Sequence, residues 1–529
     1  MDFRIKNSVL VEYTGNGGDV AIPEGVKAIG RKAFKDCTGL TRVTIPDSVK
    51  AIGLAAFEGC TNLKEVHAGS LNSWLSLDKS KWRDTPLRCG AVLYCDGAPV
   101  REVVMPAGMT RIAERAFEGW SSLISVAIPE GVTEIGESAF AGCTGLTGVS
   151  IPEGVTAIGK SAFERCTGLT RVTIPDSAAE IGIWAFLGCN DLKEVYAGSL
   201  SSWLSLDKSK WKDTPLRYGA VLYCDGTPVR EVVMPAGMTR IGERAFVGWS
   251  SLISIAIPEG VTEIGESAFA GCTGLTGVSI PEGVKKIGRR AFAGCTGLTD
   301  VSIPEGVQKL GWGAFAGCTG LTRVTIPETV REIGSYAFHR CAGLTSVTIP
   351  KTVREIGSYA FYRCAGLTSV FIPESVTWIG ASAFFGCTGL KSAAIPDRVR
   401  TICEGAFQGC TGLASVSIPD GVTEFWESAF RDCTGLTSVT IPESVTWIGP
   451  LAYEGCTGLK SVTILSGAAE IGESAFAGCT GLKSVIIPAG VTEIGGSAFE
   501  GCASLTISTP AGSCAEAYAR GNGIPVKNI

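Results

Sequence analysis

The residue types in this sequence that could carry covalent or metal chemistry are its 21 cysteines and two histidines. Cysteine thiolates act as nucleophiles and as zinc ligands, so the spacing of the cysteines decides which chemistry is open to them. Sixteen of them occupy one column, three residues after an aromatic residue, at Cys37, Cys60, Cys143, Cys166, Cys189, Cys272, Cys295, Cys318, Cys341, Cys364, Cys387, Cys410, Cys433, Cys456, Cys479 and Cys502. Trp120 and Trp249 hold the same place twice, so the position requires apolar bulk rather than sulfur. We therefore expect a ladder of buried free thiols that pack as small hydrophobic groups.

Neither zinc binding nor disulfide bonding fits this cysteine column. The chain contains no Cys-x-x-Cys pair, the spacing that is typical of structural zinc sites. Along a ladder every neighbouring cysteine is an equivalent partner, and the parallel side chains run side by side, so no disulfide pairing is unique. We expect no bound metal. Many free thiols favour a reducing compartment, although burial can protect thiols elsewhere.

The same search finds no catalytic residues. His67 and His339 lie in different parts of the chain, and neither is in a context typical of a Ser/His/Asp or Cys/His site. The glutamates recur in Pro-Glu-Gly and Ile-Gly-Glu segments, where solvated turns explain them, and no Gly-x-x-x-x-Gly-Lys-Ser/Thr segment is present to bind phosphates. The sequence predicts a protein that is not an enzyme and needs no cofactor, with an unrecognised active site as a distant alternative.

The elements that must position these residues repeat at a fixed interval. An Ala-Phe pair marks each copy, and Ala-Tyr replaces it once. The marker aromatic residues are Phe34, Phe57, Phe117, Phe140, Phe163, Phe186, Phe246, Phe269, Phe292, Phe315, Phe338, Phe361, Phe384, Phe407, Phe430, Tyr453, Phe476 and Phe499. Fifteen of the seventeen intervals between them are 23 residues long and two are 60. Such a period indicates a solenoid, whose units bury a core only against their neighbours.

A single copy predicts the course of the backbone. In Leu146–Pro152 apolar and small residues alternate and a proline ends the segment, which is typical of a short strand. Strands from successive copies are expected to form a parallel sheet at about 4.8 Å per repeat. Residues 137–143 are too few for a full helix and predict one helical or 3₁₀ turn. The expected core positions include Phe140, Cys143, Phe163, Cys166, Phe269 and Cys272.

Most copies share one pattern, which reads Leu146-x-x-Val149-x-Ile151-Pro152 followed by Val155-x-x-Ile158-Gly159-x-x-Ala162-Phe163-x-x-Cys166. It resembles the BspA-like subclass of leucine-rich repeats, a bacterial and protist family with 23-residue units, and the resemblance covers nearly the whole chain. The resemblance implies a mainly β, curved, right-handed coil, with a parallel sheet on its concave side and short helical or 3₁₀ turns opposite. It also implies roles in adhesion and protein–protein contact rather than catalysis.

Two similar inserts interrupt the repeats, at about 68–105 and about 197–234. In the first, Asp96 and Gly97 separate two apolar runs and predict a hairpin. The residues expected to pack this insert down are Trp74, Trp82 and Leu87. A structural bulge is the simpler interpretation of the inserts, and a projecting contact element is the alternative.

The predicted organisation is a solenoid of about eighteen repeats over residues 23–505, with an N-terminal hairpin cap over 1–22 and a C-terminal cap over 506–529. Caps are expected because an uncapped solenoid exposes an apolar cross-section and an unpaired sheet edge. In the last segment, Ser513 is a predicted helix N-cap and Gly521 a predicted helix end.

Charge and hydropathy exclude several classes of protein. The chain has 46 Lys and Arg against 51 Asp and Glu, a net charge of −5, and both signs are scattered, which argues against nucleic-acid binding. No run approaches the ~18 apolar residues that span a bilayer. The first residues lack the apolar stretch of a secretory signal. The family resemblance favours a cell-surface or secreted protein, whereas the missing signal and the thiols favour a cytoplasmic one.

One region offers a candidate binding surface, because the other non-core strand positions are mostly small hydroxyl residues with few anchors. His339, Tyr362 and Phe385 directly follow the marker aromatic residue in three successive repeats and should stack about 5 Å apart on the turn side. The candidate binding residues are Tyr336, His339, Arg340, Tyr359, Tyr362, Arg363, Phe371 and Phe385, with Trp312 and Trp378 nearby. An aromatic strip flanked by arginines is typical of an interface hot spot. Recent copying of the segment from Thr329 to the segment from Thr352 explains the Tyr and Arg pairs equally well.

Together these observations predict a non-catalytic scaffold for protein–protein recognition or adhesion. It would bind host or matrix proteins through an extended repeat surface, with many weak contacts acting together. The alternative is an intracellular protein-interaction scaffold. The expected partner is a protein, without nucleic acid and without membrane insertion, and self-association stays open.

Overall fold

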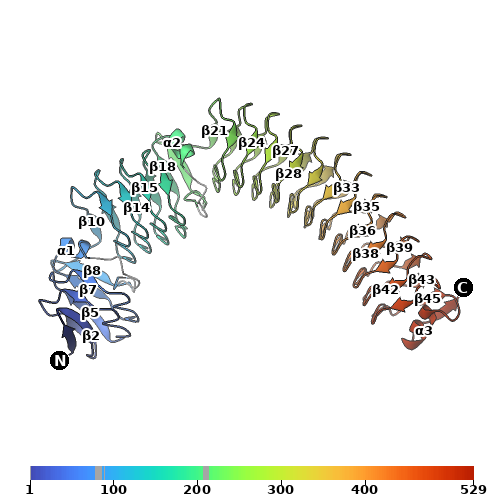
Figure 1. Ribbon diagram of the computed structural model, residues 1–529, viewed down its shortest axis with the longest axis horizontal. Helices are drawn as coiled ribbons and strands as arrows, with labels where there is room; N and C mark the ends of the chain where they lie inside the picture. The colour runs from blue at the N-terminus through green and yellow to red at the C-terminus, as the bar shows by residue number, and fades with distance from the viewer. Residues whose placement is uncertain (1, 78–85, 88–89, 207–213, 218) are drawn as a thin grey trace. The chain divides into compact units, whose positions relative to one another are not determined.

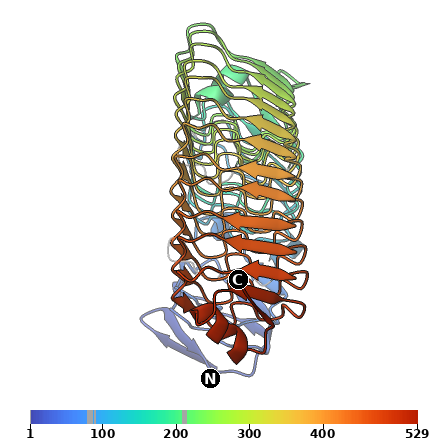
Figure 2. The same cartoon turned by 90° about the vertical axis from the view of Figure 1, so that its right-hand side faces the viewer.

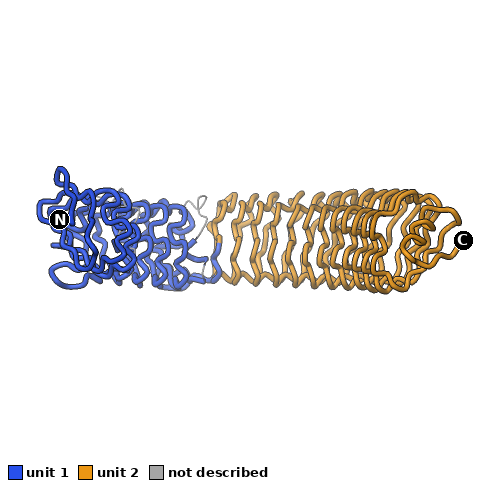
Figure 3. The backbone as a smooth tube through the Cα atoms, turned by 90° about the horizontal axis from the view of Figure 1, so that it is seen from below, with its two compact units in different colours: residues 1–230, 248–251 blue, residues 231–247, 252–529 orange. Residues whose placement is uncertain are grey.

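Residues 2–77, 86–87, 90–206, 214–217 and 219–529 are described by the computed structural model (Figure 1). Through them the backbone winds as a mainly β, parallel solenoid of about 22 turns with few helices, which confirms the predicted fold class. The strands of successive turns lie side by side as parallel arrows (Figure 2). The chain divides into two compact units (Figure 3): unit 1 holds residues 1–230 and 248–251, and unit 2 holds residues 231–247 and 252–529.

A regular repeat contributes one strand to each of two parallel sheets. In the repeat marked by Phe140, the short strand β13 (Glu134–Ile135) pairs with β15 (Ala157–Ile158), and the longer strand β14 (Gly148–Ser150) pairs with β16 (Arg171–Ile174). Both pairings join residues 23 apart in the sequence, because each repeat sits in register on the next. Side chains at equivalent positions of successive repeats therefore form columns.

The described strands of unit 1 belong to the following sheets. Those with the longer strands have the orders β3 (Gly18–Ala21), β5 (Leu40–Ile45), β7 (Glu65–Ala68), β8 (Val92–Cys95), β9 (Ala98–Pro99); β10 (Glu102–Val104), β12 (Ser125–Ala127); and β14, β16, β18 (Glu194–Ala197), β19 (Val221–Cys224), β20 (Thr227–Pro228). The others have the orders β1 (Phe3–Lys6), β2 (Val9–Tyr13), β4 (Ala28–Ile29), β6 (Ala51–Ile52); and β11 (Arg111–Ile112), β13, β15, β17 (Glu180–Ile181). Helices α1 (Leu71–Leu75) and α2 (Leu200–Ser205) lie in the two inserts.

Unit 2 is built in the same way. Its longer strands have the orders β21 (Glu231–Val233), β23 (Ser254–Ala256), β25 (Gly277–Ser279), β27 (Asp300–Ser302), β29 (Arg323–Thr325), β31 (Ser346–Thr348), β33 (Ser369–Phe371); β35 (Ser392–Ala394), β37 (Ser415–Ser417); and β39 (Ser438–Ile441), β41 (Ser461–Ile464), β43 (Ser484–Ile486), β45 (Thr506–Thr509), β46 (Val526–Asn528). Its short strands have the orders β22 (Arg240–Ile241), β24 (Glu263–Ile264), β26 (Lys286–Ile287), β28 (Lys309–Leu310), β30 (Glu332–Ile333), β32 (Glu355–Ile356), β34 (Trp378–Ile379); and β36 (Thr401–Ile402), β38 (Glu424–Phe425), β40 (Trp447–Ile448), β42 (Glu470–Ile471), β44 (Glu493–Ile494). Helix α3 spans Cys514–Gly521.

The segment around each marker phenylalanine is a series of tight turns rather than a continuous helix. The N–H of Cys143 donates to the carbonyl of Phe140 at 3.1 Å, while the N–H of Phe140 donates to Ala162 of the next repeat at 2.7 Å. Ser138 and Gly142 have φ values of 54° and 75°, and such left-handed residues interrupt the right-handed backbone that a helix needs. The predicted helical or 3₁₀ turn is therefore present as single turns linked between repeats.

The marker rings form the core of both units. Phe140 and Phe163 stack with their centroids 5.1 Å apart, and Phe269 and Phe292 at 5.0 Å. The side chains of Phe140, Cys143, Phe163, Cys166, Phe269 and Cys272 are all fully buried. Since burial of one phenylalanine contributes roughly 2 kcal/mol, the stacked column is a main source of cohesion between repeats.

Each insert extends the longer-strand sheet by one strand and then turns back. In the first insert, β8 pairs in parallel with β7 and antiparallel with β9, through a turn at Asp96 and Gly97 with φ values of 51° and 78°. The predicted Asp-Gly hairpin is confirmed, but its second strand has only two residues, because β10 pairs with β12 of the next repeat instead. Trp74 and Leu87 are buried as expected, and Trp82 lies outside the described residues.

Segments that differ from the repeats lie near both ends of the described chain. Strands β1 and β2 form an antiparallel hairpin, and β2 also pairs in parallel with β4. Helix α3 begins after Ser513, whose Oγ accepts the N–H of Glu516 at 3.1 Å, and it ends at Gly521. Strands β45 and β46 continue the parallel sheet, so residues 506–529, expected as a cap, also carry two sheet strands.

Candidate interaction surface

Three successive turn segments of unit 2 bring the predicted aromatic residues together. His339, Tyr362 and Phe385 each follow a buried marker phenylalanine. Their rings stack in one column, with centroids 5.0 Å apart between His339 and Tyr362 and 4.7 Å apart between Tyr362 and Phe385. The stack follows from the 23-residue register, as the spacing predicts.

A second column of rings lies beside the first. Tyr336 stacks on Tyr359 at 4.8 Å, and Trp312 contacts Tyr336 at 4.8 Å with tilted planes. Tilted contacts of Tyr336 with His339 at 5.3 Å and of Tyr359 with Tyr362 at 5.6 Å join the two columns. We call Trp312, Tyr336, His339, Tyr359, Tyr362 and Phe385 the aromatic array. All six side chains are half-buried, so they present edges rather than whole rings to solvent.

Four arginines surround the aromatic array. The guanidinium carbon of Arg289 lies 4.3 Å from the ring centroid of Trp312, and that of Arg290 lies 4.8 Å from it. The guanidinium carbon of Arg363 lies 5.4 Å from the ring of Tyr362, and Arg340 occupies the equivalent position one repeat earlier. All four side chains are exposed. Their charges therefore lie at the solvent side of an apolar surface.

The pKa of the His339 imidazole reflects its burial and the charges around it. Burial lowers the pKa of His339, and the positive charges of Arg340 and Arg363 lower it further. At neutral pH this ring is therefore uncharged and packs like its aromatic neighbours. The positive charge of the surface resides on the arginines alone.

Two residues expected with this strip lie elsewhere. Phe371 is on strand β33, where it pairs in register with Thr348 and is 67% exposed. Trp378 is on the short strand β34. Neither ring contacts the aromatic array within the described residues, because strand positions and turn positions belong to different faces of the coil. The candidate residues therefore fall on two surfaces, with Phe371 alone on the longer-strand sheet.

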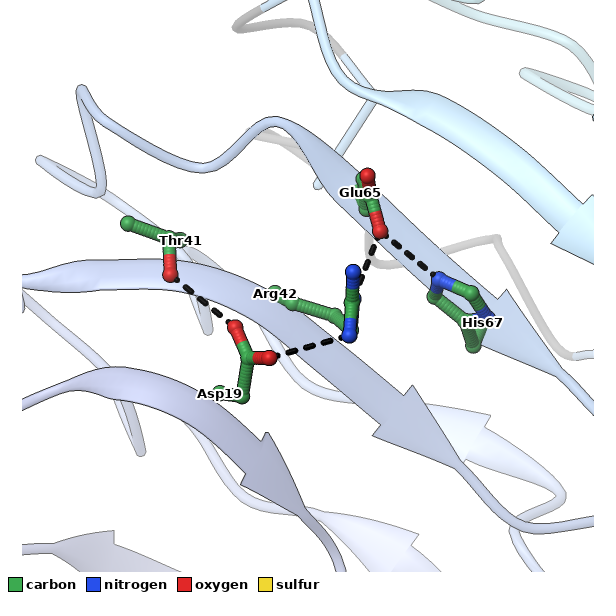
Figure 4. A network of polar contacts seen from close by, with 5 residues as sticks. All are labelled: Asp19, Thr41, Arg42, Glu65 and His67. Atoms are coloured by element: carbon green, nitrogen blue, oxygen red, sulfur yellow. Dashed lines mark hydrogen bonds and ion pairs between the residues drawn. The ribbon is translucent and has the colours of Figure 1, made fainter.

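A polar network on the longer-strand sheet of unit 1 was not predicted. Arg42 donates from Nε to Glu65 at 2.6 Å and from Nη1 to Asp19 at 2.9 Å (Figure 4). Nε2 of His67 lies 3.0 Å from the same carboxylate of Glu65, and the His67 ring stacks on Tyr94 at 4.6 Å. The hydrogen bond from Arg42, followed by that with His67, lowers the pKa of Glu65.

The second insert repeats this arrangement. Glu194 accepts the hydroxyl of Tyr196 at 3.2 Å and lies 3.7 Å from Nε of Arg171, and Tyr196 stacks on Tyr223 at 4.8 Å. In both copies the charged groups satisfy one another across neighbouring strands, which fits a role in holding each insert to the sheet. The signal in the sequence is a Glu-Val-His or Glu-Val-Tyr strand directly before each insert.

The described residues show little sign of other chemistry. No group of three or more His, Cys, Asp and Glu side chains among them could hold a metal ion. All the cysteines in the described ranges have free thiols, and most are buried. No helix of the described chain is long and apolar enough to cross a membrane.

Comparison with known proteins places the chain among repeat proteins. The family model described as a BspA type leucine rich repeat region matches residues 6–78, 91–207, 221–344, 314–434 and 379–506. Residues 1–5 and 507–529 have no match, and the two internal stretches without one, residues 79–90 and 208–220, fall inside the two inserts. A comparison with curated proteins found no match.

Three solved structures illustrate the similarity. A leucine-rich repeat protein from Bacteroides ovatus is 28% identical, with 72% of this chain and 92% of that chain covered and a TM-score of 0.45. One from Eubacterium ventriosum is 22% identical, with 72% and 90% covered and a TM-score of 0.41. A leucine rich cell surface protein from Faecalibacterium prausnitzii is 23% identical, with 98% and 94% covered and a TM-score of 0.24. The family model matches far more than half of the residues of this chain, so the chain belongs to the BspA-type leucine-rich repeat family.

Proposed function

We propose that this chain is a non-catalytic recognition or adhesion scaffold that binds a host or matrix protein through its repeat surface. Its family supports a repeat scaffold of the protein-interaction type. The observation that carries the proposal is the aromatic array of unit 2 with its four exposed arginines. Tyr, Trp and Arg are the side chains that dominate protein–protein hot spots.

The binding residues we propose on the turn side are Tyr336, His339, Arg340, Tyr359, Tyr362, Arg363 and Phe385. Because their rings pack on one another, their conformations are largely fixed before a partner arrives, which reduces the entropy lost on binding. Phe371 is a separate candidate anchor on the sheet, where it pairs in register with Thr348 and is exposed.

The experiment measures binding of the full-length chain to proteins of an extracellular-matrix extract, with the bound protein identified and purified. The variant H339A/Y362A/F385A should weaken its binding by about tenfold or more, as expected for loss of a hot spot. The control Q408A/E500A alters the same position of the repeat outside the aromatic array. The assignment of binding to the turn side fails if the triple variant keeps its fold and binds as tightly as the control.

If the partner binds the longer-strand sheet rather than the turns, the variants should affect its binding differently. In that case F371A would weaken binding and the triple variant would not. The two variants therefore assign the binding face independently of the partner's identity.

A second candidate function is an intracellular protein-interaction scaffold. The column of buried free thiols favours it, because reduced cysteines persist in reducing compartments. Fractionation of the producing cells distinguishes the two: protein at the surface or in the medium supports adhesion, and protein confined to the cytosol supports the alternative.

A further inference from the structure

Some cations of unit 2 are paired with carboxylates, whereas the four arginines around the aromatic array, like Lys285, Arg331 and Arg354, have no such partner within the described residues. Lys286 pairs with Glu263 at 2.8 Å, Lys309 with Glu332 at 2.6 Å and Arg323 with Asp300 at 2.9 Å. By contrast, no Asp or Glu oxygen of the described chain lies within 4.0 Å of a guanidinium nitrogen of Arg289, Arg290, Arg340 or Arg363. Four positive charges are thus gathered on one surface without internal compensation.

The rings fix where these charges lie. Arg289 and Arg290 sit over Trp312, and Arg363 sits over Tyr362, in the geometry of cation–π contacts. A guanidinium that rests with one face on a ring keeps the N–H groups along its edge free for hydrogen bonds. Those edges match a carboxylate, which can accept two parallel hydrogen bonds from one arginine.

The same packing limits what else the surface can bind. Tyr336 lies between Trp312 and Tyr359, and Tyr362 lies between His339 and Phe385, so both faces of each central ring are covered. A nucleic-acid base or a sugar would need a free ring face for stacking, which the two central rings do not offer. The exposed ring edges instead offer contact to aliphatic side chains.

The repeat spacing sets the pattern of the ligand. Arg290 lies two residues before its marker phenylalanine, and Arg340 and Arg363 lie two residues after theirs. Their repeats are two and three apart, which corresponds to about 10 and 14 Å along the stack at about 4.8 Å per repeat. An extended peptide rises about 3.3 Å per residue, so it covers these distances in about three and four residues. Side chains of an extended peptide alternate between its two faces, so carboxylates four residues apart point to the same side, with an apolar side chain midway between them. Such a segment would meet Arg290 and Arg363 at its ends and ring edges in the middle.

We propose that the aromatic array and its four arginines bind an extended acidic segment of a partner protein, with carboxylates about four residues apart and apolar residues between. This rests on the proposed function and adds the chemical class of the partner. The attraction comes from charge complementarity, and the half-buried rings reduce competition from water and salt at the contact.

The test uses the full-length chain and a fluorescent synthetic peptide with glutamates four residues apart and leucines between them. Fluorescence anisotropy should show saturable binding that weakens as salt rises, because exposed charges are screened. The variants R289Q/R290Q and R340Q/R363Q should each weaken binding by about tenfold or more, since hydrogen bonds to charged groups exceed 1.4 kcal/mol on average. The matched control K309Q/R323Q removes two paired cations of the same unit and should bind like the unmodified chain.

Three results would overturn the inference: no binding of the peptide, equal loss in the control and the arginine variants, or tighter arginine-dependent binding of a heparin fragment or single-stranded DNA. The last would assign the surface to another class of polyanion. Failure of the acidic-segment inference can be distinguished from failure of the proposed function. If the purified matrix partner loses affinity for H339A/Y362A/F385A but not for the arginine variants, the recognition role stands and the acidic segment is wrong.

Discussion

At the scale of single residues, the cysteine column is a ladder of hydrogen bonds as well as a hydrophobic filler. Every thiol of the cysteine column except that of Cys37 donates a hydrogen bond to the carbonyl of the marker aromatic residue one repeat earlier. Examples are Cys143 to Phe117 at 3.0 Å and Cys341 to Phe315 at 3.1 Å. Trp120 and Trp249 stand in the first repeat after each insert, and Cys37, the first cysteine of the column, donates to the carbonyl of Lys35 instead. The sequence alone predicted buried thiols but not their hydrogen bonds.

The contributions of the marker ring and of the column thiol to the free energy of unfolding can be compared within one repeat. Phe338→Ala removes a fully buried ring and should lower the free energy of unfolding by about 3–5 kcal/mol. Cys341→Ala removes a smaller group and one weak hydrogen bond, so a loss of about 1–2 kcal/mol is expected. Urea denaturation followed by circular dichroism checks the order, with the exposed Thr345→Ala as control. Equal losses for both core variants would show that the ring column is not the main source of cohesion.

Thiol reactivity should follow burial. Burial raises the pKa of Cys403 to about 11 and that of Cys410 to about 12, so both thiols are protonated, and hence unreactive, at neutral pH. Cys37 and Cys514 are only half-buried and should react first with an alkylating reagent. Mass spectrometry of the labelled peptides, with and without denaturant, makes the comparison. Rapid labelling of Cys410 in the folded chain would contradict the buried ladder.

At the scale of elements, the sequence predicted what a single repeat can show. Alternation and the closing proline located the strand within Leu146–Pro152, of which residues 148–150 are extended. The two-residue strands of the second sheet were missed because Glu134–Ile135 is too short for any alternation to appear. The hairpin of the insert was predicted from Asp96-Gly97, but its pairing was not, since parallel pairing of β8 with β7 depends on the fold of the neighbouring repeat.

Helix α2 of the second insert depends on a carboxylate from the preceding repeat. Asp176 accepts the N–H of Ser199 at 2.8 Å and the hydroxyl of Ser202, and these hydrogen bonds, led by that of Ser202, lower the pKa of Asp176. Because the folded pKa lies below the unfolded one, this contribution is present above about pH 4 and is lost as the pH falls through the lowered value.

Asp176→Asn should therefore increase hydrogen exchange in α2 at pH 6, and the difference from the unmodified chain should shrink towards pH 2–3. Asp191→Asn, at an exposed position of the same unit, serves as control. An unchanged exchange rate in α2 would show that the helix is held by its buried Trp203 alone.

At the scale of the whole molecule, the candidate surface exists only because repeats stack. The register predicted that His339, Tyr362 and Phe385 form a column, and they do. Phe371 lies on another face, because it falls between Val370 and Ile372 in the strand segment of its repeat rather than in the turn. The sequence could not show that Arg289 and Arg290 lie over Trp312, a contact between neighbouring repeats that depends on side-chain conformation.

Stability should also be distributed along the stack, since each repeat contacts mainly its neighbours. Phe315→Ala should raise hydrogen exchange in the repeats next to it, with little effect on the repeats of unit 1. Mass spectrometry of exchange along the full chain locates the effect, and Thr319→Ala at an exposed position of the same repeat is the control. Uniform loss of protection over the whole chain would mean that the units unfold as one.

The most direct test of the recognition surface is hydrogen exchange of the full-length chain with and without its purified protein partner. We expect added protection in the turn segments 335–340, 358–363 and 381–386, where the aromatic array lies. Strands β31 and β33 should change little. Protection confined to the longer-strand sheet, or to unit 1, would contradict the assignment of the binding surface to the aromatic array.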